Sequence, residues 1–115
     1  MSLLVNAYRI DANGRWIDLP ADQNNYDLAG FESTRRTFYG SEKSIQLGLK
    51  ILPELAHNDI YAKGEEQLDA LGAEVSVLRN SLDPSDDHWH FRLGNILRAI
   101  QLAKPYGDAG MVVIW

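Results

Sequence analysis

The amino-acid sequence predicts an α+β protein in which a small sheet packs against two long amphipathic helices and one short helix. Three patterns lead to this prediction: two β-favouring runs near the N-terminus, two segments with apolar residues at helical spacing, and an unbroken apolar run at the end. A sheet formed from an N-terminal hairpin and a C-terminal strand would cover the apolar stripes of both helices. The length of 115 residues suits a single domain, residues 1–115.

The N-terminal segment is predicted to form a β-hairpin. Residues 3–10 place side chains alternately on two faces, as a strand requires, and residues 15–19 follow as the returning strand. Asn13 and Gly14 lie between them, and this dipeptide tolerates the positive φ angles of a tight turn. Residues 26–39 fit either a short strand or an ordered loop.

The remaining elements follow from start and stop signals. A short helix is expected to begin after Ser41 as N-cap and to end near Lys50, with an irregular segment from Pro53 to Ala62. Long helices are predicted over residues 64–82 and about 89–104, and residues 111–115 are predicted as a buried strand beside residues 3–10. The residues expected to line the buried helix faces are Leu68, Leu71, Val75, Leu78, Leu82, Leu93, Ile96, Leu97, Ile100 and Ala103.

Composition and charge narrow the classes of function. The chain has 11 basic and 16 acidic residues, a formal net charge of −5, and no cysteine. Nucleic-acid binders need clustered Lys and Arg, so we expect no nucleic-acid partner, whereas the charge suits a partner with a basic surface. An N-terminus unlike a signal peptide and the lack of cysteine favour a cytoplasmic protein, and no apolar run is long enough to span a bilayer.

No pattern of residues indicates catalysis. His88 and His90 flank Trp89 just after two aspartates, but a complete set of metal ligands is missing, so a capped helix start is the favoured interpretation. The sequence contains neither a nucleophile elbow nor a phosphate-binding glycine motif. We therefore expect no enzyme activity, no metal and no cofactor.

Aromatic residues outside the helical stripes are the remaining candidates for function. Several lie beside acidic residues, a combination that suits recognition of a basic protein surface. For any single ring, the competing interpretation of a lid over the core is favoured. The residues predicted to bind a partner are Tyr26, Asp27, Glu32, Asp59, Tyr61, Asp86, Asp87 and Trp89.

Three segments, residues 44–53, 91–103 and 110–115, carry a resemblance to a known class of proteins. Over residues 41–115 the chain resembles immunity proteins of bacterial toxin–immunity systems, including those of contact-dependent growth inhibition. The resemblance implies a small cytosolic protein that binds and neutralises a cognate toxin domain, such as a nuclease, by blocking its active site or substrate groove. The alternatives are a small enzyme or ligand-binding domain with a pocket between sheet and helices, and a structural adaptor subunit.

Overall fold

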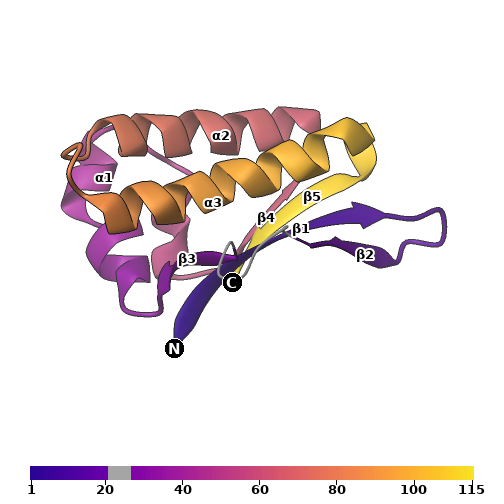
Figure 1. Ribbon diagram of the computed structural model, residues 1–115, viewed down its shortest axis with the longest axis horizontal. Helices are drawn as coiled ribbons and strands as arrows, with labels where there is room; N and C mark the ends of the chain where they lie inside the picture. Colours follow the sequence, from indigo (N-terminus) through magenta and orange to yellow (C-terminus); the bar gives the residue numbers. More distant parts are fainter. Residues whose placement is uncertain (21–26) are drawn as a thin grey trace.

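The computed structural model describes residues 1–20 and 27–115, and it confirms the predicted α+β class. Two long helices lie side by side across one face of an antiparallel sheet (Figure 1). None of the helices in the described ranges is long and apolar enough to cross a membrane. The elements are β1 (Ser2–Ile10), β2 (Trp16–Leu19), β3 (Leu28–Phe31), a π-helix (Arg35–Tyr39), α1 (Glu42–Gln46), a 3-10 helix (Leu52–Ala56), β4 (Ile60–Lys63), α2 (Glu65–Asn80), α3 (Asp87–Ala103), a second 3-10 helix (Lys104–Ala109) and β5 (Gly110–Ile114).

The sheet is centred on β1 and β5, which come from opposite ends of the chain. Its strand order is β2-β1-β5-β4, and β3 pairs with the N-terminal part of β1. In the β1–β5 pair, Val5 lies opposite Ile114 and Tyr8 lies opposite Met111. Every residue of β5 is buried, as its continuous apolar sequence requires for a strand between two neighbours. The prediction of a closing strand beside residues 3–10 is confirmed.

Both long helices turn their predicted apolar stripes toward the sheet. Leu71, Leu78, Ile96 and Ile100 are at most 5% exposed, which confirms the predicted helix register. Leu82 and Leu97 are only partly buried and pack against the margin of this core. On the sheet side the core is completed by Leu3, Val5, Ala7, Ile60, Ala62, Val112 and Ile114.

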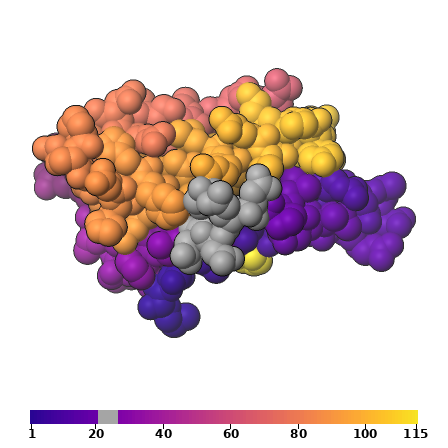
Figure 2. Space-filling model, viewed as in Figure 1, coloured from indigo at the N-terminus to yellow at the C-terminus, as the bar shows by residue number. Residues whose placement is uncertain are grey.

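The predicted N-terminal hairpin is also confirmed, with a turn that spans residues 11–15. Asp11 organises this turn, because its carboxylate accepts bonds from the backbone N–H groups of Asn13 and Arg15 at 2.8 and 2.9 Å. Gly14 has φ +80°, which explains the preference for glycine there. The hairpin projects from the body of the molecule beyond the ends of the long helices (Figures 1 and 2).

The short helix starts where it was predicted to and ends earlier. Ser41 caps α1 by accepting a bond from the Ser44 N–H at 3.2 Å. The helix stops at Gln46 instead of near Lys50, because Gly48 takes φ +84° just beyond its end and the Gly48 N–H returns to the Ile45 carbonyl.

The prediction that residues 53–62 are irregular is wrong. Pro53 occupies the first turn of a 3-10 helix, where its missing N–H costs nothing, and strand β4 follows. Residues 28–39, for which strand and loop were both open, contain β3 and the π-helix. The buried side chain of Asn95 in α3 ties β3 to the helices by donating to the Leu28 carbonyl at 2.8 Å.

Glu74 of α2 holds the segment that leads into the first 3-10 helix. Its carboxylate accepts bonds from the backbone N–H groups of Lys50, Ile51 and Leu52, all at 2.9–3.0 Å. N–H groups at the start of a helix have no partner within that helix, so an external carboxylate satisfies them.

We expect Glu74→Ala to lower the free energy of unfolding by roughly 1.5–3 kcal/mol, since three backbone donors lose a charged acceptor. Glu74→Gln keeps one acceptor oxygen and should lose less. Urea titration followed by circular dichroism measures both. A Glu74→Ala protein as stable as the wild type would mean that water replaces the carboxylate without cost.

Candidate functional site

The face of the sheet opposite the long helices carries a group of aromatic side chains. Tyr8 is paired with Met111, and Tyr61 is paired with Val113, so these side chains share a face. Trp115 lies opposite Leu4, because their backbones exchange two hydrogen bonds of 2.9 Å. Trp115 is two residues beyond Val113 in the chain, and side chains two residues apart in a strand point to the same face, so Trp115 belongs to this face as well. We call Tyr8, Trp16, Tyr61 and Trp115 the aromatic face.

The four rings of the aromatic face contact one another. Tyr8 lies 5.4 Å from Trp16 and 6.5 Å from Trp115 between ring centroids, and Trp16 lies 6.2 Å from Tyr61. The Trp115 indole N–H donates to the Asn6 side chain at 2.8 Å, which fixes the ring further. Even so, Trp16, Tyr61 and Trp115 are 47%, 51% and 39% exposed. The aromatic face is therefore ordered before any partner arrives, and much of its surface faces solvent.

Two apolar side chains of the central strand lie on the same side of the sheet as the aromatic rings. Met111 and Val113 point toward the aromatic face, away from the helices, yet they are 4% and 0% exposed. The same side of the sheet therefore combines buried aliphatic side chains with partly exposed aromatic rings. Rigid amphipathic rings of this kind supply large contact area at a small loss of side-chain entropy on binding.

Two opposite charges lie on the same side of the sheet as the aromatic face. Asp18 is paired with Tyr8 across β1 and β2, and Lys63 is paired with Met111 across β4 and β5. Burial, and then the nearby Asp18 carboxylate, raise the pKa of the Tyr8 hydroxyl above its usual value. The Tyr8 hydroxyl therefore stays protonated and can donate a hydrogen bond at neutral pH.

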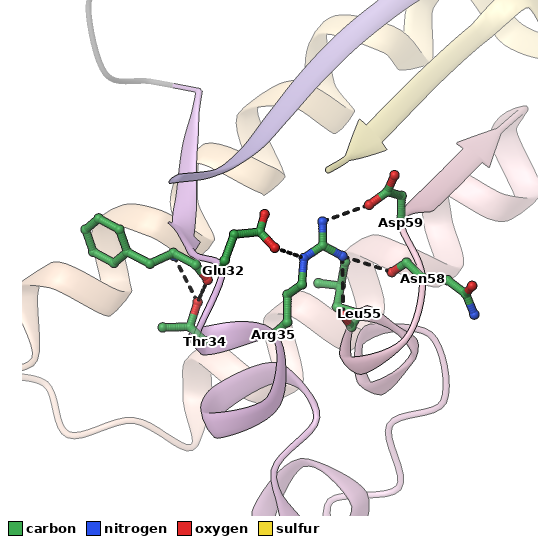
Figure 3. A network of polar contacts seen from close by, with 7 residues as sticks. Glu32, Thr34, Arg35, Leu55, Asn58 and Asp59 are labelled. Atoms are coloured by element: carbon green, nitrogen blue, oxygen red, sulfur yellow. Dashed lines mark hydrogen bonds and ion pairs between the residues drawn. The ribbon is translucent and has the colours of Figure 1, made fainter. Parts of the chain in front are cut away.

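Two of the predicted partner-binding residues, Glu32 and Asp59, lie on either side of Arg35 instead of standing free (Figure 3). Arg35 donates from Nε to Glu32 at 2.9 Å and from Nη2 to Asp59 at 2.7 Å. Its Nη1 reaches the carbonyls of Leu55 and Asn58 at 3.3 and 3.2 Å. This network joins the π-helix to the segment before β4, so both carboxylates have a structural role.

A hollow of about 430 Å³ lies beside this Arg35 network. Ionisable groups converge there, as the alternative of a ligand-binding domain requires. However, each nitrogen of the guanidinium already donates within the chain, and no hydroxyl-bearing side chain is among the described residues around the hollow. The residues that line it are Glu32, Arg35, Leu55, Ala56, His57, Asn58 and Asp59.

The predicted residues near the start of α3 form a separate arrangement. Trp89 is half-buried and stacks on Phe38 with ring centroids 3.5 Å apart and planes 8° from parallel, and the Arg92 guanidinium lies 4.8 Å from its centroid. Asp86 caps α3 by accepting a 3.4 Å bond from the Trp89 N–H, while Asp87 is exposed in the first turn. These contacts favour the lid interpretation for Trp89.

The other predicted residues are dispersed. Asp27 is half-buried, and its carbonyl accepts a 2.8 Å bond from the Val5 N–H. Tyr26 lies outside the described residues. Among the predicted residues that the structure describes, Tyr61 alone belongs to the aromatic face. Alternation along the predicted hairpin would have placed Tyr8 and Trp16 on one side, but nothing in the sequence indicates which side the helices leave open.

Comparison with known proteins gave no relative. No protein-family model matches the chain, and searches of curated proteins and of solved structures gave no match. What the aromatic face can do is therefore inferred from its own geometry and chemistry.

Proposed function

We propose that this protein binds another protein through the aromatic face, and that the partner is a toxin domain with a basic surface. In this proposal it acts as an immunity protein, covering the active site or substrate groove of the toxin. The observation that carries the binding proposal is the set of four contacting rings opposite the long helices, three of which, Trp16, Tyr61 and Trp115, stay 39–51% exposed. Aromatic residues at the centre of a patch are the usual anchors of protein interfaces.

A protein partner fits the aromatic face better than a nucleic acid does. Exposed rings on a sheet can stack bases, but such sites also need a basic groove for the phosphates. Among the described strand residues on this side of the sheet, the charged ones are Asp18 and Lys63, one of each sign, on a chain with net charge −5. The phosphates of a nucleic acid would therefore find little favourable electrostatic interaction at this surface.

A basic partner is favoured by both long-range and short-range electrostatics. The net charge of −5 attracts a basic domain and raises its rate of association. At short range, the faces of Trp and Tyr rings attract the cations of Lys and Arg side chains. Asp18 beside Tyr8 adds a carboxylate that such a side chain could pair with.

The test is binding to the toxin domain encoded by the adjacent reading frame, measured by surface plasmon resonance at two salt concentrations. We expect tight binding whose association rate falls as salt rises, because screening weakens the attraction between the two domains. Asp87→Lys, an exposed change outside the aromatic face, should slow association and leave dissociation unchanged. Absence of binding by the wild-type protein would overturn the toxin proposal.

A further inference from the structure

Strand β4 forms an open edge of the sheet next to the aromatic face. Within the described ranges, β4 pairs with β5 alone. The Gly64 N–H donates to the Gly110 carbonyl at 2.9 Å, which sets the alternation of hydrogen bonds along this antiparallel pair. The backbone groups of Ile60 and Ala62 consequently face β5, and those of Tyr61 and Lys63 face the open edge.

One residue on this edge keeps both of its backbone groups available. The Lys63 N–H is already bound by the Gln67 side chain at 2.9 Å. By contrast, neither the N–H nor the carbonyl of Tyr61 has a hydrogen-bond partner among residues 1–20 and 27–115. Unpaired groups on a strand edge are a template for a further strand.

A groove of about 200 Å³ runs beside the same edge, between β4, α2 and the first 3-10 helix. Ile51, Ala62 and Ala70 give it apolar walls, while Glu54 and Asp59 add carboxylates. Asp59 is already paired with Arg35, so the exposed Glu54 supplies most of the negative charge available to a side chain that enters the groove. A long side chain with an apolar stem and a cationic head suits such a groove.

We propose that the partner adds an extended strand to the edge of β4, with an Arg or Lys side chain in this groove. The proposal rests on the proposed function, because the strand belongs to the partner protein, and it specifies how that partner is held. The backbone of Tyr61 exchanges two hydrogen bonds with one residue of the added strand. That residue points its side chain toward the ring of Tyr61, and the next residue along points into the groove toward Glu54.

The experiment tethers a probe segment, Thr-Val-Arg-Val-Thr, to the C-terminus of the chain. Trp115 follows directly after Ile114, which pairs with Ile60, so a flexible Gly-Ser linker of about 12 residues reaches the β4 edge and holds the probe at millimolar effective concentration. Amide hydrogen exchange of Tyr61, measured by NMR, is the readout. We expect exchange at least threefold slower than in the protein that carries the linker alone.

Two matched probes separate the two parts of the proposal. Thr-Pro-Arg-Pro-Thr lacks the N–H groups that would bond to the Tyr61 carbonyl, and Thr-Val-Glu-Val-Thr reverses the charge in the groove; both should leave Tyr61 exchange near that of the linker-only protein. Unchanged exchange with the Arg probe, or equal slowing by all three, overturns the proposal. The probe contains no part of a toxin, so the two experiments test the two proposals separately. A probe that does not slow Tyr61 exchange overturns strand addition but not binding of the toxin domain. A wild-type protein that does not bind the toxin domain overturns the toxin proposal but not the result obtained with the probe.

Discussion

Replacing Leu78 with alanine is expected to lower the free energy of unfolding by about 2–5 kcal/mol, because it leaves a cavity in the hydrophobic core. The Leu78 side chain is 2% exposed and belongs to the hydrophobic core. Val77, its neighbour in α2, is 44% exposed and provides a matched control. Val77→Ala should change stability by less than about 0.5 kcal/mol, as surface substitutions usually do.

Urea unfolding of the two variants, followed by circular dichroism, measures this difference. A large loss for Leu78→Ala with little change for Val77→Ala supports the register of α2 described above. Equal losses at both positions would mean that the helix presents a different face to the core.

Trp16→Ala is expected to speed dissociation of the proposed toxin partner by roughly 30-fold or more, which corresponds to the 2 kcal/mol or greater effect of an interface anchor. Trp16 touches both Tyr8 and Tyr61, so its removal also loosens the neighbouring rings. Association should change little, since anchors act mainly on the dissociation rate and the net charge is unaltered.

Trp16→Phe is the matched variant for this prediction, because it keeps an aromatic ring at the position. It should recover most of the slow dissociation. Thermal melts of both proteins establish that they are folded at the temperature of the binding experiment. Dissociation as slow in Trp16→Ala as in the wild type would remove Trp16 from the interface.

The parts of the fold that could be predicted from sequence are those specified by local pattern. Leu68, Leu71, Val75 and Leu78 recur at helical spacing within one segment, and their burial follows from that spacing. The closing strand is a run of apolar residues long enough to require cover on both faces. Each of these signals lies within one short stretch of chain.

Strand β4 could not be predicted, because its partner is distant in the sequence. It has four residues, and its apolar positions, Ile60 and Ala62, are too few to mark a period. What makes it a strand is the edge of β5, some fifty residues further along, to which Ile60 and Ala62 bond. Tertiary pairing of this kind commonly decides short strands.

The candidate site depended even more on distant contacts. Glu32 and Asp59 were predicted to bind a partner, whereas Arg35 binds both from the π-helix. Tyr8 and Trp115 lie 107 positions apart in the chain, and they meet only because β1 and β5 pair in one register. The acidic and aromatic residues of the sequence therefore indicated candidates for partner binding, but the strand pairing of the sheet determines which of them lie together.

The most direct test of the aromatic face compares two tyrosines of similar exposure in the same binding experiment. Tyr61 belongs to the aromatic face and is 51% exposed, whereas Tyr106 lies in the second 3-10 helix and is 45% exposed. Dissociation rates of the toxin domain are measured for Tyr61→Ala and Tyr106→Ala. Dissociation at least tenfold faster for Tyr61→Ala, with Tyr106→Ala matching the wild type, is the result expected if the helix-free face is the interface. Equal rates for the two variants would contradict it.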